Sequence, residues 1–590
     1  MEADRSQVIL VKEINPDEGF VPPHDFTEFN DKLYFTTDYG GYGNELWVTD
    51  GTIQGTQLVK DINNTGNTGS DPMELTVFDN RLYFRANDGN GHELWVSDGT
   101  TQGTQLVKDI NPGSYEPIYD KSPYAPDSVP NSSYPSSFTE LNDRLYFEAD
   151  DEVNGHELWV TDGTTQGTQL LKDINPGSDG SYPGPSDESQ FTQFNGQLYF
   201  DTSKRDSNEN LVYDRQWVSD GTAEGTQPAT DLDFNFGRES VYFNDKLYFN
   251  AGDEVHGGEL WVSDGTPEGS QLVKDINPGS QSSSVENLTA SSQELYFTAD
   301  NGVNGLELWV SDGTEEGTQL VRDINPGSER AFIDNLTVFN DILYFAANNR
   351  VDGDELWVSD GTEEGTQLLK DIAPGTESSY PNDLTVFNNR LYFTALNEAS
   401  DRQLWVSDGT EEGTQLVGDF NPSSENSSIS DLTVFGNELF FSSNNKLFKI
   451  ISYNLNEGTN NNSDELSGTS DRDRLEGLNG RDTLTGDAGN DKLFGGAGDD
   501  SLFGGADNDV LIGGAGNDVL TGGAGDDFFA LATEGEDTIT DFQLGSDLLG
   551  LAGFDYENLT FADNAIYADD RLLVNVLNIN TENLTTADFI

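Results

Sequence analysis

An aspartate recurs every nine residues between Gly468 and Ala530, near the C-terminal end of the 590-residue chain. It takes the sixth place of the pattern G-G-x-G-x-D-x-U-x, in which U is a large apolar residue, as in Gly495–Phe503. Glycines let the six-residue turn adopt conformations that other residues resist, so that carbonyl oxygens can point inward beside the carboxylate. Because Ca²⁺ takes about six to eight oxygen ligands, the pattern predicts calcium sites. The candidate side-chain ligands are Asp473, Asp482, Asp491, Asp500, Asp509, Asp518 and Asp527.

The same unit predicts the scaffold that positions these aspartates. Its eighth place is apolar in all seven copies, from Leu475 to Phe529, so each copy ends in a short strand whose side chain fills an interior. Two copies make one winding, and successive windings stack as two parallel sheets. The alternative is an acidic, Gly-rich disordered tail, but a register kept through seven copies argues against it. Without calcium, stacked aspartates repel one another, and we expect the region to unfold.

This tract resembles the RTX, or haemolysin-type, calcium-binding repeats. The resemblance implies that calcium lies between adjacent turns, held by the aspartates and by turn carbonyls. The first copy departs from the pattern at Thr469 and Asp471, and Glu536–Leu548 resembles the segment that follows such repeats in exported proteins. In that family an uncleaved C-terminal region directs export through a type I secretion apparatus, which implies a secreted protein. The implied carbonyl ligands lie near Gly480, Gly489, Gly498, Gly516 and Gly525.

A second repeat occupies the chain before residue 453 and contains all eight tryptophans. Each unit, such as the one with Glu45–Thr52, reads as four short strands separated by turns rich in Asn, Asp and Gly. Four strands per unit are typical of a β-propeller blade. The sequence predicts nine blades, with eight as the alternative, and closure of the ring by a lone N-terminal strand at residues 8–14. The tryptophans are predicted to pack between neighbouring blades.

These units resemble the ELWxxDGT repeats of bacterial exoproteins, which implies a repeat array without a defined activity. The whole chain is therefore predicted to be all-β and to have four parts. They are a propeller of four-stranded blades over 8–452, a linker over 453–466, a parallel β-roll over 467–530, and a small β-rich cap with the secretion region over 531–590.

Composition restricts the partners of the protein. It has 107 Asp and Glu against 29 Lys and Arg, a formal net charge of -78, which repels nucleic acid and anionic membrane surfaces and attracts cations. Cysteine is absent, which excludes disulfides and thiol chemistry. No apolar run approaches the roughly 18 residues of a membrane span, so no membrane insertion is expected. The first residues lack an apolar signal segment, which fits export without a cleaved N-terminal signal.

No nucleophile motif, zinc spacing or phosphate loop is recognisable, so we expect a non-enzymatic extracellular or cell-surface protein. Its propeller would serve as a scaffold for binding or surface association. Two alternatives remain: an extracellular hydrolase or lyase, for example a glycan-active one, with its site in the propeller channel, and a structural component of a matrix or sheath. The predicted ligand site, for a cell-surface glycan or protein, lies on an inserted loop rich in Pro, Tyr and Ser. Its residues are Tyr115, Tyr119, Tyr124 and Tyr134.

Overall fold

The structure is a computed structural model of the chain. It contains β-strands and three short 3-10 helices, and no described segment forms an α-helix. Two compact units are present: Leu10–Lys449, and residues 450–590 together with the N-terminal residues up to Ile9. The residues that the structure describes are 6–14, 21–38, 41–64, 68–115, 129–183, 191–205, 211–229, 235–264, 266, 269–397, 401–418, 420, 429–459, 463–530, 535–551, 554, 556–562, 564–568 and 571–590.

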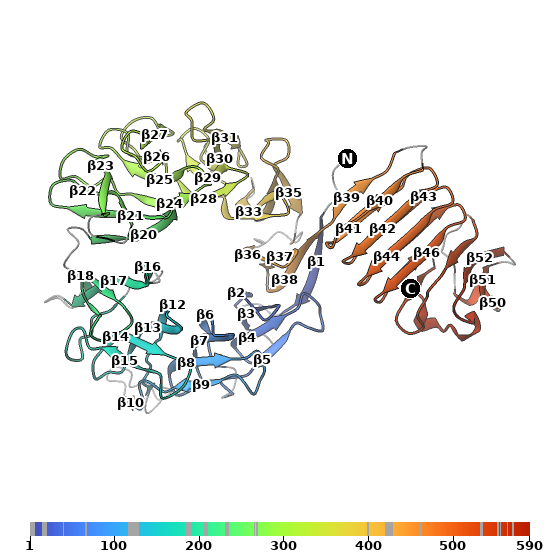
Figure 1. Cartoon of the computed structure of the whole chain (residues 1–590), viewed down its shortest axis with the longest axis horizontal. Helices are drawn as coiled ribbons and strands as arrows, with labels where there is room; N and C mark the ends of the chain where they lie inside the picture. Colours follow the sequence, from blue (N-terminus) through green and yellow to red (C-terminus); the bar gives the residue numbers. More distant parts are fainter. Residues whose placement is uncertain are drawn as a thin grey trace. The chain divides into compact units, whose positions relative to one another are not determined.

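The first unit is a nine-bladed propeller. Within the described residues, nine four-stranded sheets stand around a ring (Figure 1), so the prediction of nine blades is confirmed and the eight-bladed alternative is wrong. Eight blades follow chain order. Their strands are β2 (His24–Phe29), β3 (Lys32–Asp38), β4 (Asn44–Thr49), β5 (Gln57–Lys60); β6 (Met73–Phe78), β7 (Arg81–Asn87), β8 (His92–Ser97), β9 (Gln105–Lys108); β12 (Ser136–Leu141), β13 (Arg144–Asp150), β14 (His156–Thr161), β15 (Gln169–Lys172); β16 (Thr192–Phe194), β17 (Gln197–Arg205), β18 (Leu211–Ser219), β19 (Gln227–Pro228); β20 (Asn235–Phe243), β21 (Lys246–Asp253), β22 (Gly257–Ser263), β23 (Gln271–Lys274); β24 (Glu286–Ala290), β25 (Leu295–Asp300), β26 (Leu306–Ser311), β27 (Gln319–Arg322); β28 (Asp334–Phe339), β29 (Ile342–Asn348), β30 (Asp354–Ser359), β31 (Gln367–Lys370); β32 (Asn382–Phe387), β33 (Arg390–Leu396), β34 (Arg402–Ser407) and β35 (Gln415–Gly418).

The ninth blade joins the two ends of the ring. It consists of β36 (Ser430–Phe435), β37 (Glu438–Ser443), β38 (Lys446–Ser452) and the N-terminal strand β1 (Ser6–Glu13), which lies next to β38. This arrangement confirms closure by the N-terminal strand, and it covers two sheet edges that would otherwise be open to pairing with another chain.

The tryptophans pack between neighbouring blades, as predicted. Trp309 on β26 is 5% exposed and shares a buried cluster with Tyr248 and Leu260 of the preceding blade. Basic side chains on the fourth strands add polar links between blades, because Nζ of Lys274 donates a hydrogen bond to the carbonyl oxygen of Thr318 in the next blade at 2.5 Å. The sparse lysines of this acidic chain therefore connect blade to blade.

A buried glutamate ties six of the blades to the connection that follows them. Glu355 is typical: its carboxylate accepts hydrogen bonds from the N–H groups of Ile372 (2.8 Å) and Ser379 (3.0 Å) and from the Ser379 hydroxyl (2.6 Å). Burial nevertheless raises the pKa of Glu355 to about 7. Gln403 takes the equivalent place in the blade of Trp405. The equivalent buried glutamates in the other five of these blades are Glu45, Glu93, Glu157, Glu259 and Glu307.

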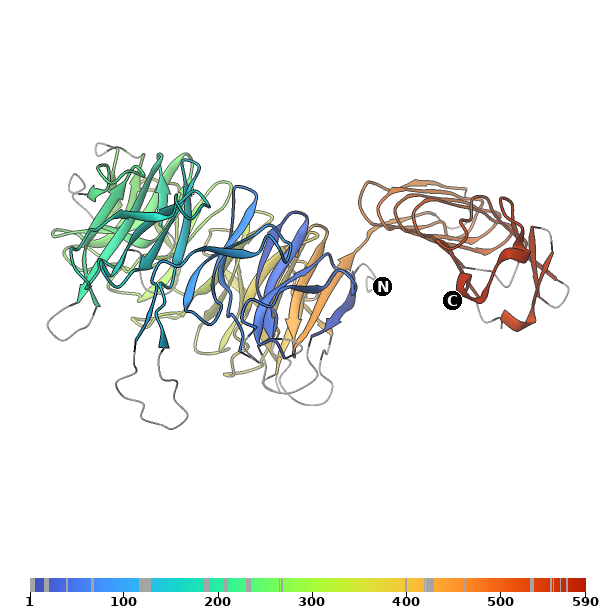
Figure 2. The same cartoon turned by 90° about the horizontal axis from the view of Figure 1, so that it is seen from below.

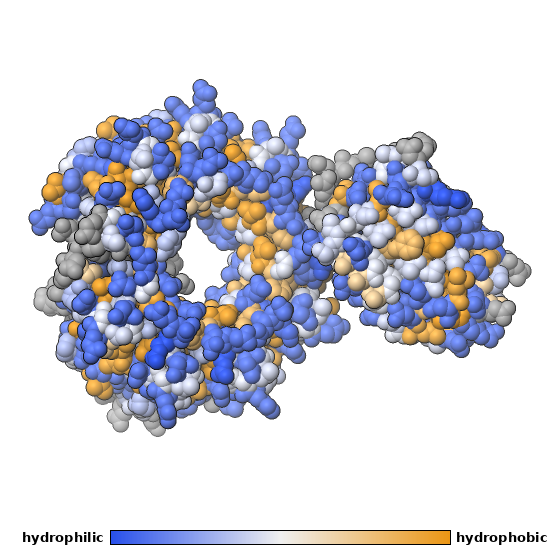
Figure 3. Space-filling view, viewed as in Figure 1, coloured by the Kyte–Doolittle hydropathy of each residue, from blue (hydrophilic) through white to orange (hydrophobic). Residues whose placement is uncertain are grey.

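Strand starts and strand ends alternate between the two faces of the ring. Figure 2 shows the blades from the side, with their connections gathered at two faces. The connection from one blade to the next lies on the same face as the loop between second and third strands, here named the crossover face. The inserted segment begins there with a small ribbon, in which β10 (Ser114–Tyr115) pairs with β11 (Val129–Pro130). The space-filling view shows the opening at the centre of the ring and a mainly hydrophilic surface around it (Figure 3).

The second unit is a parallel solenoid of two sheets, as the sequence predicts. The sheets reach beyond the predicted roll of 467–530, because β39 and β40 arise within 453–466 and β48 and β49 follow residue 530. One sheet contains β39 (Asn454–Glu457), β41 (Asp473–Glu476), β43 (Lys492–Ala497), β45 (Val510–Ala515), β47 (Phe528–Ala530) and β49 (Leu548–Gly550). The other contains β40 (Glu465–Ser467), β42 (Thr483–Ala488), β44 (Ser501–Ala506), β46 (Val519–Ala524), β48 (Asp537–Ile539), β52 (Arg571–Val576), β51 (Ala565–Ala568) and β50 (Leu559–Ala562).

The last residues cover the end of the solenoid. The three final strands form a small antiparallel addition to the second sheet, beginning with β52 beside β48. Ile566 and Val576 of this addition belong to the same buried cluster as the solenoid leucines. Three 3-10 helices complete the region: η1 (Tyr556–Asn558), η2 (Thr581–Asn583) and η3 (Thr586–Asp588). No described helix of the protein has the length and apolar character needed to cross a membrane.

Candidate metal centre

A winding of eighteen residues brings each repeat aspartate next to its counterpart in the following winding. The parallel register pairs Leu484 with Leu502 in β42 and β44, and the leucines at the eighth place point into one buried cluster. The aspartate two residues earlier is therefore fixed at the start of each strand. All seven repeat aspartates are no more than 2% exposed.

One oxygen of each carboxylate is used in a ladder of hydrogen bonds. The N–H of Asp482 donates to Oδ1 of Asp500 at 2.8 Å, and the N–H of Asp500 donates to Oδ1 of Asp518 at 2.8 Å. A second ladder links Asp491 and Asp509 in the same way, at 2.9 Å. Each carboxylate is thus held in place by the main chain of the preceding winding.

The second oxygen has no such partner in the interior of the repeats. Oδ2 is buried and accepts no hydrogen bond from any described residue in Asp482, Asp491, Asp500, Asp509, Asp518 and Asp527. A buried carboxylate oxygen without a partner is costly, because it has lost its hydration without replacement. Six such oxygens recur at regular spacing, and each is open to coordination by a cation.

Main-chain carbonyl oxygens lie close to these unpartnered Oδ2 atoms. A Cβ added to Gly495 would lie 2.6 Å from Oδ2 of Asp500 and 2.6 Å from the carbonyl oxygen of Gly513, one winding away. Gly477 has the same relation to Asp482 and to the carbonyl oxygen of Gly495. Glycine at the first place of the repeat therefore leaves room where carboxylate and carbonyl oxygens meet, and this donor set suits Ca²⁺.

The electrostatics of the ladders also favour a bound cation. Burial, with further contributions from neighbouring carboxylates, raises the pKa of Asp491 to about 7 and that of Asp509 to about 8. The same causes raise the pKa of Asp500 and of Asp527 to about 6. No three acidic or histidine side chains converge on one point among the described residues, so carbonyl oxygens must supply much of any coordination shell.

The ends of the ladders differ from their middle. Oδ2 of Asp473 accepts hydrogen bonds from the N–H (2.7 Å) and the hydroxyl (3.0 Å) of Thr469. Thr469 stands where the last four copies have glycine, so the departure from the pattern has a direct structural effect. Oδ2 of Asp547 likewise accepts from the N–H of Gln543 at 2.7 Å. The protein itself satisfies these end carboxylates.

The repeat pattern missed two members of the ladders. Asp537 and Asp547 are 2% and 1% exposed, and their Oδ1 atoms accept hydrogen bonds from the N–H groups of Asp518 and Asp527, both at 3.0 Å. The first two glycines of the repeat are absent around them, but the glycine two residues before the aspartate is kept as Gly535 and Gly545. The remaining signal is the pattern Gly-x-Asp-x-apolar, in Gly535–Ile539 and Gly545–Leu549.

Three copies carry another residue where the backbone requires a left-handed conformation. Leu478, Asp487 and Asp507 have φ of 73°, 86° and 74°. Gly496 and Gly505, at the place that Leu478 and Asp487 take in their own copies, have φ of 106° and 126°. The fold thus imposes the glycine geometry even where the sequence lacks glycine.

The predicted ligand loop is described only at its two ends. Tyr115 and Tyr134 are 53% and 50% exposed, and both line a pocket of about 350 Å³ on the crossover face. The ring of Tyr134 stacks on His92, with centroids 5.4 Å apart. Tyr119 and Tyr124 lie outside the described residues.

Comparisons with known proteins agree with this geometry in the C-terminal region. The family of RTX calcium-binding nonapeptide repeats (4 copies) matches residues 459–493, 467–502 and 494–529. These repeats bind calcium, so Ca²⁺ is the cofactor of the C-terminal region. A search of curated proteins finds no match.

Solved structures resemble the chain only distantly. One of two prolyl endopeptidases aligns over 67% of this chain and 56% of its own, with 11% identity and a TM-score of 0.34. Oligopeptidase B from Leishmania major aligns over 68% and 56%, with 10% identity and a TM-score of 0.34. The β-propeller domain of the Trilobed protease from Pyrococcus furiosus aligns over 68% and 99%, with 9% identity and a TM-score of 0.29. The chain spans less than two thirds of the length of the peptidases, and at these scores the likeness carries no functional argument.

Proposed function

We propose that this protein is a secreted, extracellular calcium-binding protein whose solenoid folds around calcium and whose propeller is a binding scaffold. The observation that carries the calcium part is the set of six buried, unpartnered Oδ2 atoms in the two aspartate ladders. We assign these six aspartates as calcium ligands, together with turn carbonyls near Gly480, Gly489, Gly498, Gly516 and Gly525. Asp473 is the weakest of the predicted ligands, since Thr469 already satisfies it.

Folding and calcium binding are coupled in this proposal. Without a cation, the ladders hold buried carboxylates close to one another, which destabilises the fold. Calcium binding relieves this, so the free energy of binding contributes to the free energy of folding. Cytosolic calcium is scarce and external calcium is abundant. A chain that needs calcium to fold stays unfolded inside the cell, which suits passage through a type I secretion apparatus directed by the C-terminal region.

We also propose that residues 8–452 are ELWxxDGT repeats that form a platform for a cell-surface glycan or protein. The exposed rings of Tyr115 and Tyr134 beside a pocket support a ligand site at the inserted loop. Deletion of residues 114–133 should weaken binding to cells or glycans; unchanged binding would rule out this site.

A calcium titration of the full chain tests the central part of this proposal. Circular dichroism should show β-structure increasing as Ca²⁺ is added to chelated protein, whereas Mg²⁺ at the same concentration should have little effect. Mg²⁺ demands a small octahedral site and gives up its water reluctantly, which a site of carbonyl and carboxylate oxygens does not favour. A spectrum that does not respond to Ca²⁺ would refute calcium-coupled folding.

A further inference from the structure

One position on the crossover face has a left-handed backbone in six blades. It lies in the connection that leads to the first strand of a blade, and φ ranges from 46° to 53°. In four of these blades its N–H donates to the carbonyl oxygen of the residue that begins the third strand of the preceding blade, for example from Tyr380 to Asp354 at 3.2 Å. The six residues are Asp71, Tyr134, Tyr182, Ser284, Phe332 and Tyr380.

The aromatic residues at this position are not required by the fold. Asp71 and Ser284 adopt the same conformation in their own blades, so a small polar residue suffices there. Phe332 and Tyr380 are nevertheless 50% and 52% exposed. A large ring at positive φ and in solvent costs free energy that folding does not recover, and such outliers point to a functional use.

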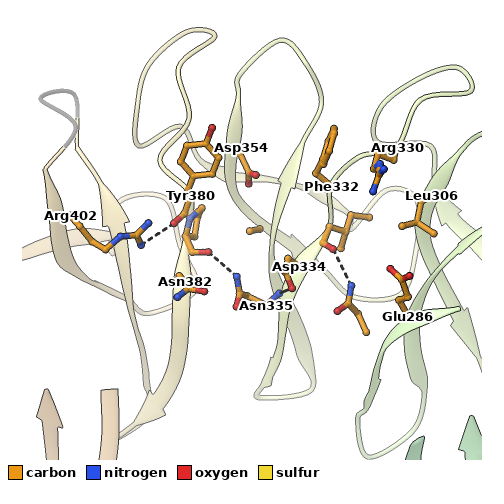
Figure 4. A pocket seen from close by; sticks show the side chains of 14 residues that line it. Glu286, Leu306, Arg330, Phe332, Asp334, Asn335, Asp354, Tyr380, Asn382 and Arg402 are labelled. Carbon is orange, nitrogen blue, oxygen red and sulfur yellow. Dashed lines mark hydrogen bonds between the residues drawn. The ribbon is translucent and has the colours of Figure 1, made fainter. Parts of the chain in front are cut away.

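Phe332 and Tyr380, in consecutive blades, border one groove (Figure 4). The groove has a volume of about 500 Å³, within the range of about 300–1,000 Å³ that is usual for small-ligand sites. Its floor is formed by the starts of the innermost strands β24, β28 and β32, which supply Glu286, Asp334 and Asn382.

An arginine contacts each of the two aromatic residues. The guanidinium of Arg330 lies 5.2 Å from the ring centroid of Phe332. Nη1 of Arg402 donates hydrogen bonds to the carbonyl oxygen of Tyr380 (3.2 Å) and to Oγ1 of Thr394 (3.0 Å). Both aromatic positions are thus supported by cationic side chains, which are rare in this chain.

Between the two rings lies a carboxylate with spare hydrogen-bonding capacity (Figure 4). Oδ1 of Asp354 is buried and has no hydrogen-bond partner among the described residues. Burial, with a smaller contribution from Asp334, raises the pKa of Asp354 to about 6. The groove therefore offers an unused acceptor close to two exposed aromatic faces.

We propose that this groove binds a neutral oligosaccharide. The two rings provide flat apolar faces for sugar rings, Asp354 accepts hydrogen bonds from hydroxyl groups, and Arg330 donates them. Three carboxylates (Glu286, Asp334 and Asp354) face two arginines in the groove, so its charge is far more balanced than that of the whole chain. This balance favours a neutral ligand over a polyanion or a polycation. The inference rests on the proposed role of the propeller as a binding scaffold.

The test uses the full, calcium-loaded chain and two designed variants. Wild type is screened against immobilised cello-, malto-, laminari-, manno- and xylo-hexaoses, with alginate and polylysine as charged probes, and affinities are then measured by calorimetry. The double variant Phe332→Ser/Tyr380→Ser introduces serine, which is compatible with the fold because Ser284 occupies the same position in another blade. Asp354→Asn copies Asn44, which takes the same place in the first blade. Tyr182→Ser is the control at an equivalent position outside this groove.

We expect wild type to bind at least one neutral hexaose. The double variant should bind it at least about tenfold more weakly, Asp354→Asn about tenfold more weakly, and Tyr182→Ser within about twofold of wild type. The inference is overturned if no neutral hexaose binds, if only alginate or polylysine binds, or if the double variant with an unchanged melting temperature binds as wild type does. In that last case the propeller remains a scaffold and only the groove is wrong, so the two claims fail separately.

Discussion

The buried glutamates of the propeller and the ladder aspartates of the solenoid differ in how their carboxylates are satisfied. In the propeller, both oxygens of Glu355 accept hydrogen bonds from main-chain N–H groups and a serine hydroxyl. In the solenoid, Oδ1 of Asp500 is satisfied by the main chain while Oδ2 has no partner among the described residues. The carboxylate of Glu355 is complete with protein atoms alone, whereas that of Asp500 keeps one oxygen open to a cation. An acidic composition therefore says little about ion dependence until the partners of each carboxylate are counted.

Substitution within the ladders should produce the largest effect on this contrast. Asp509→Asn removes the charge of a carboxylate whose Oδ2 is unpartnered, and we expect calcium affinity to fall by at least about tenfold, with a lower melting temperature of the solenoid. The matched control is Asp473→Asn, whose Oδ2 is satisfied by Thr469 and whose loss should change calcium affinity much less. Calorimetric calcium titrations of both variants make the comparison. Equal losses would show that the unpartnered oxygen is not what binds the ion.

Lower pH should weaken calcium binding. Because the folded-state pKa of Asp509 is about 8 and that of Asp491 about 7, protons compete with calcium for these carboxylates between about pH 8 and 6. In calcium-free protein, lower pH has the opposite effect and favours the folded state. The folded solenoid takes up protons that the unfolded chain, with ordinary aspartate pKa values, does not take up. Its free energy of unfolding should therefore rise as pH falls from about 8 to 5. Calcium titrations at pH 8 and 6, with circular dichroism spectra of the chelated protein at both, check this; an affinity independent of pH would contradict it.

In the propeller, acidification should stabilise the fold without involving calcium. Burial raises the pKa of Glu307 to about 8 and that of the other five glutamates to about 7, above the unfolded value, so stability rises as pH falls toward 5. Glu307→Gln should fold, since Gln403 occupies the same place in another blade, and should remove about one sixth of this pH dependence. Urea unfolding between pH 5 and 8 measures the slope. An unaltered slope would mean that Glu307 does not titrate in this range.

Backbone strain in the solenoid should give the smallest effect. Asp487 has φ of 86° where the next four copies have glycine, so Asp487→Gly should raise the stability of the calcium-loaded solenoid by about 1 kcal/mol. Asp471→Gly is the control, because Asp471 is not among the described residues with positive φ. Melting temperatures in saturating calcium report the difference. A loss of stability on Asp487→Gly would show that its side chain contributes more than its backbone costs.

Sequence periodicity predicted most of this architecture because both units repeat. The nine-residue register correctly predicted the two stacked parallel sheets, and the lone N-terminal strand was correctly predicted to close the ring. The periodicity did not predict Asp537 and Asp547, since their turns keep only Gly535 and Gly545 of the repeat glycines and break the nine-residue spacing. It also could not show that Asp473 is satisfied, because that depends on a hydrogen bond from Thr469 within one turn. The Phe332 and Tyr380 groove combines residues of separate blades, and only the closed ring brings them together.

Hydrogen–deuterium exchange of the full chain, with and without calcium, tests the central contrast most directly. Removal of calcium should abolish protection in the solenoid strands β42 to β47, while the propeller strands β25, β26, β29 and β30 keep theirs. The peptides around Asp500 and Asp509 should change most. Equal protection of the solenoid in both conditions, or loss of protection in both units together, would contradict the account.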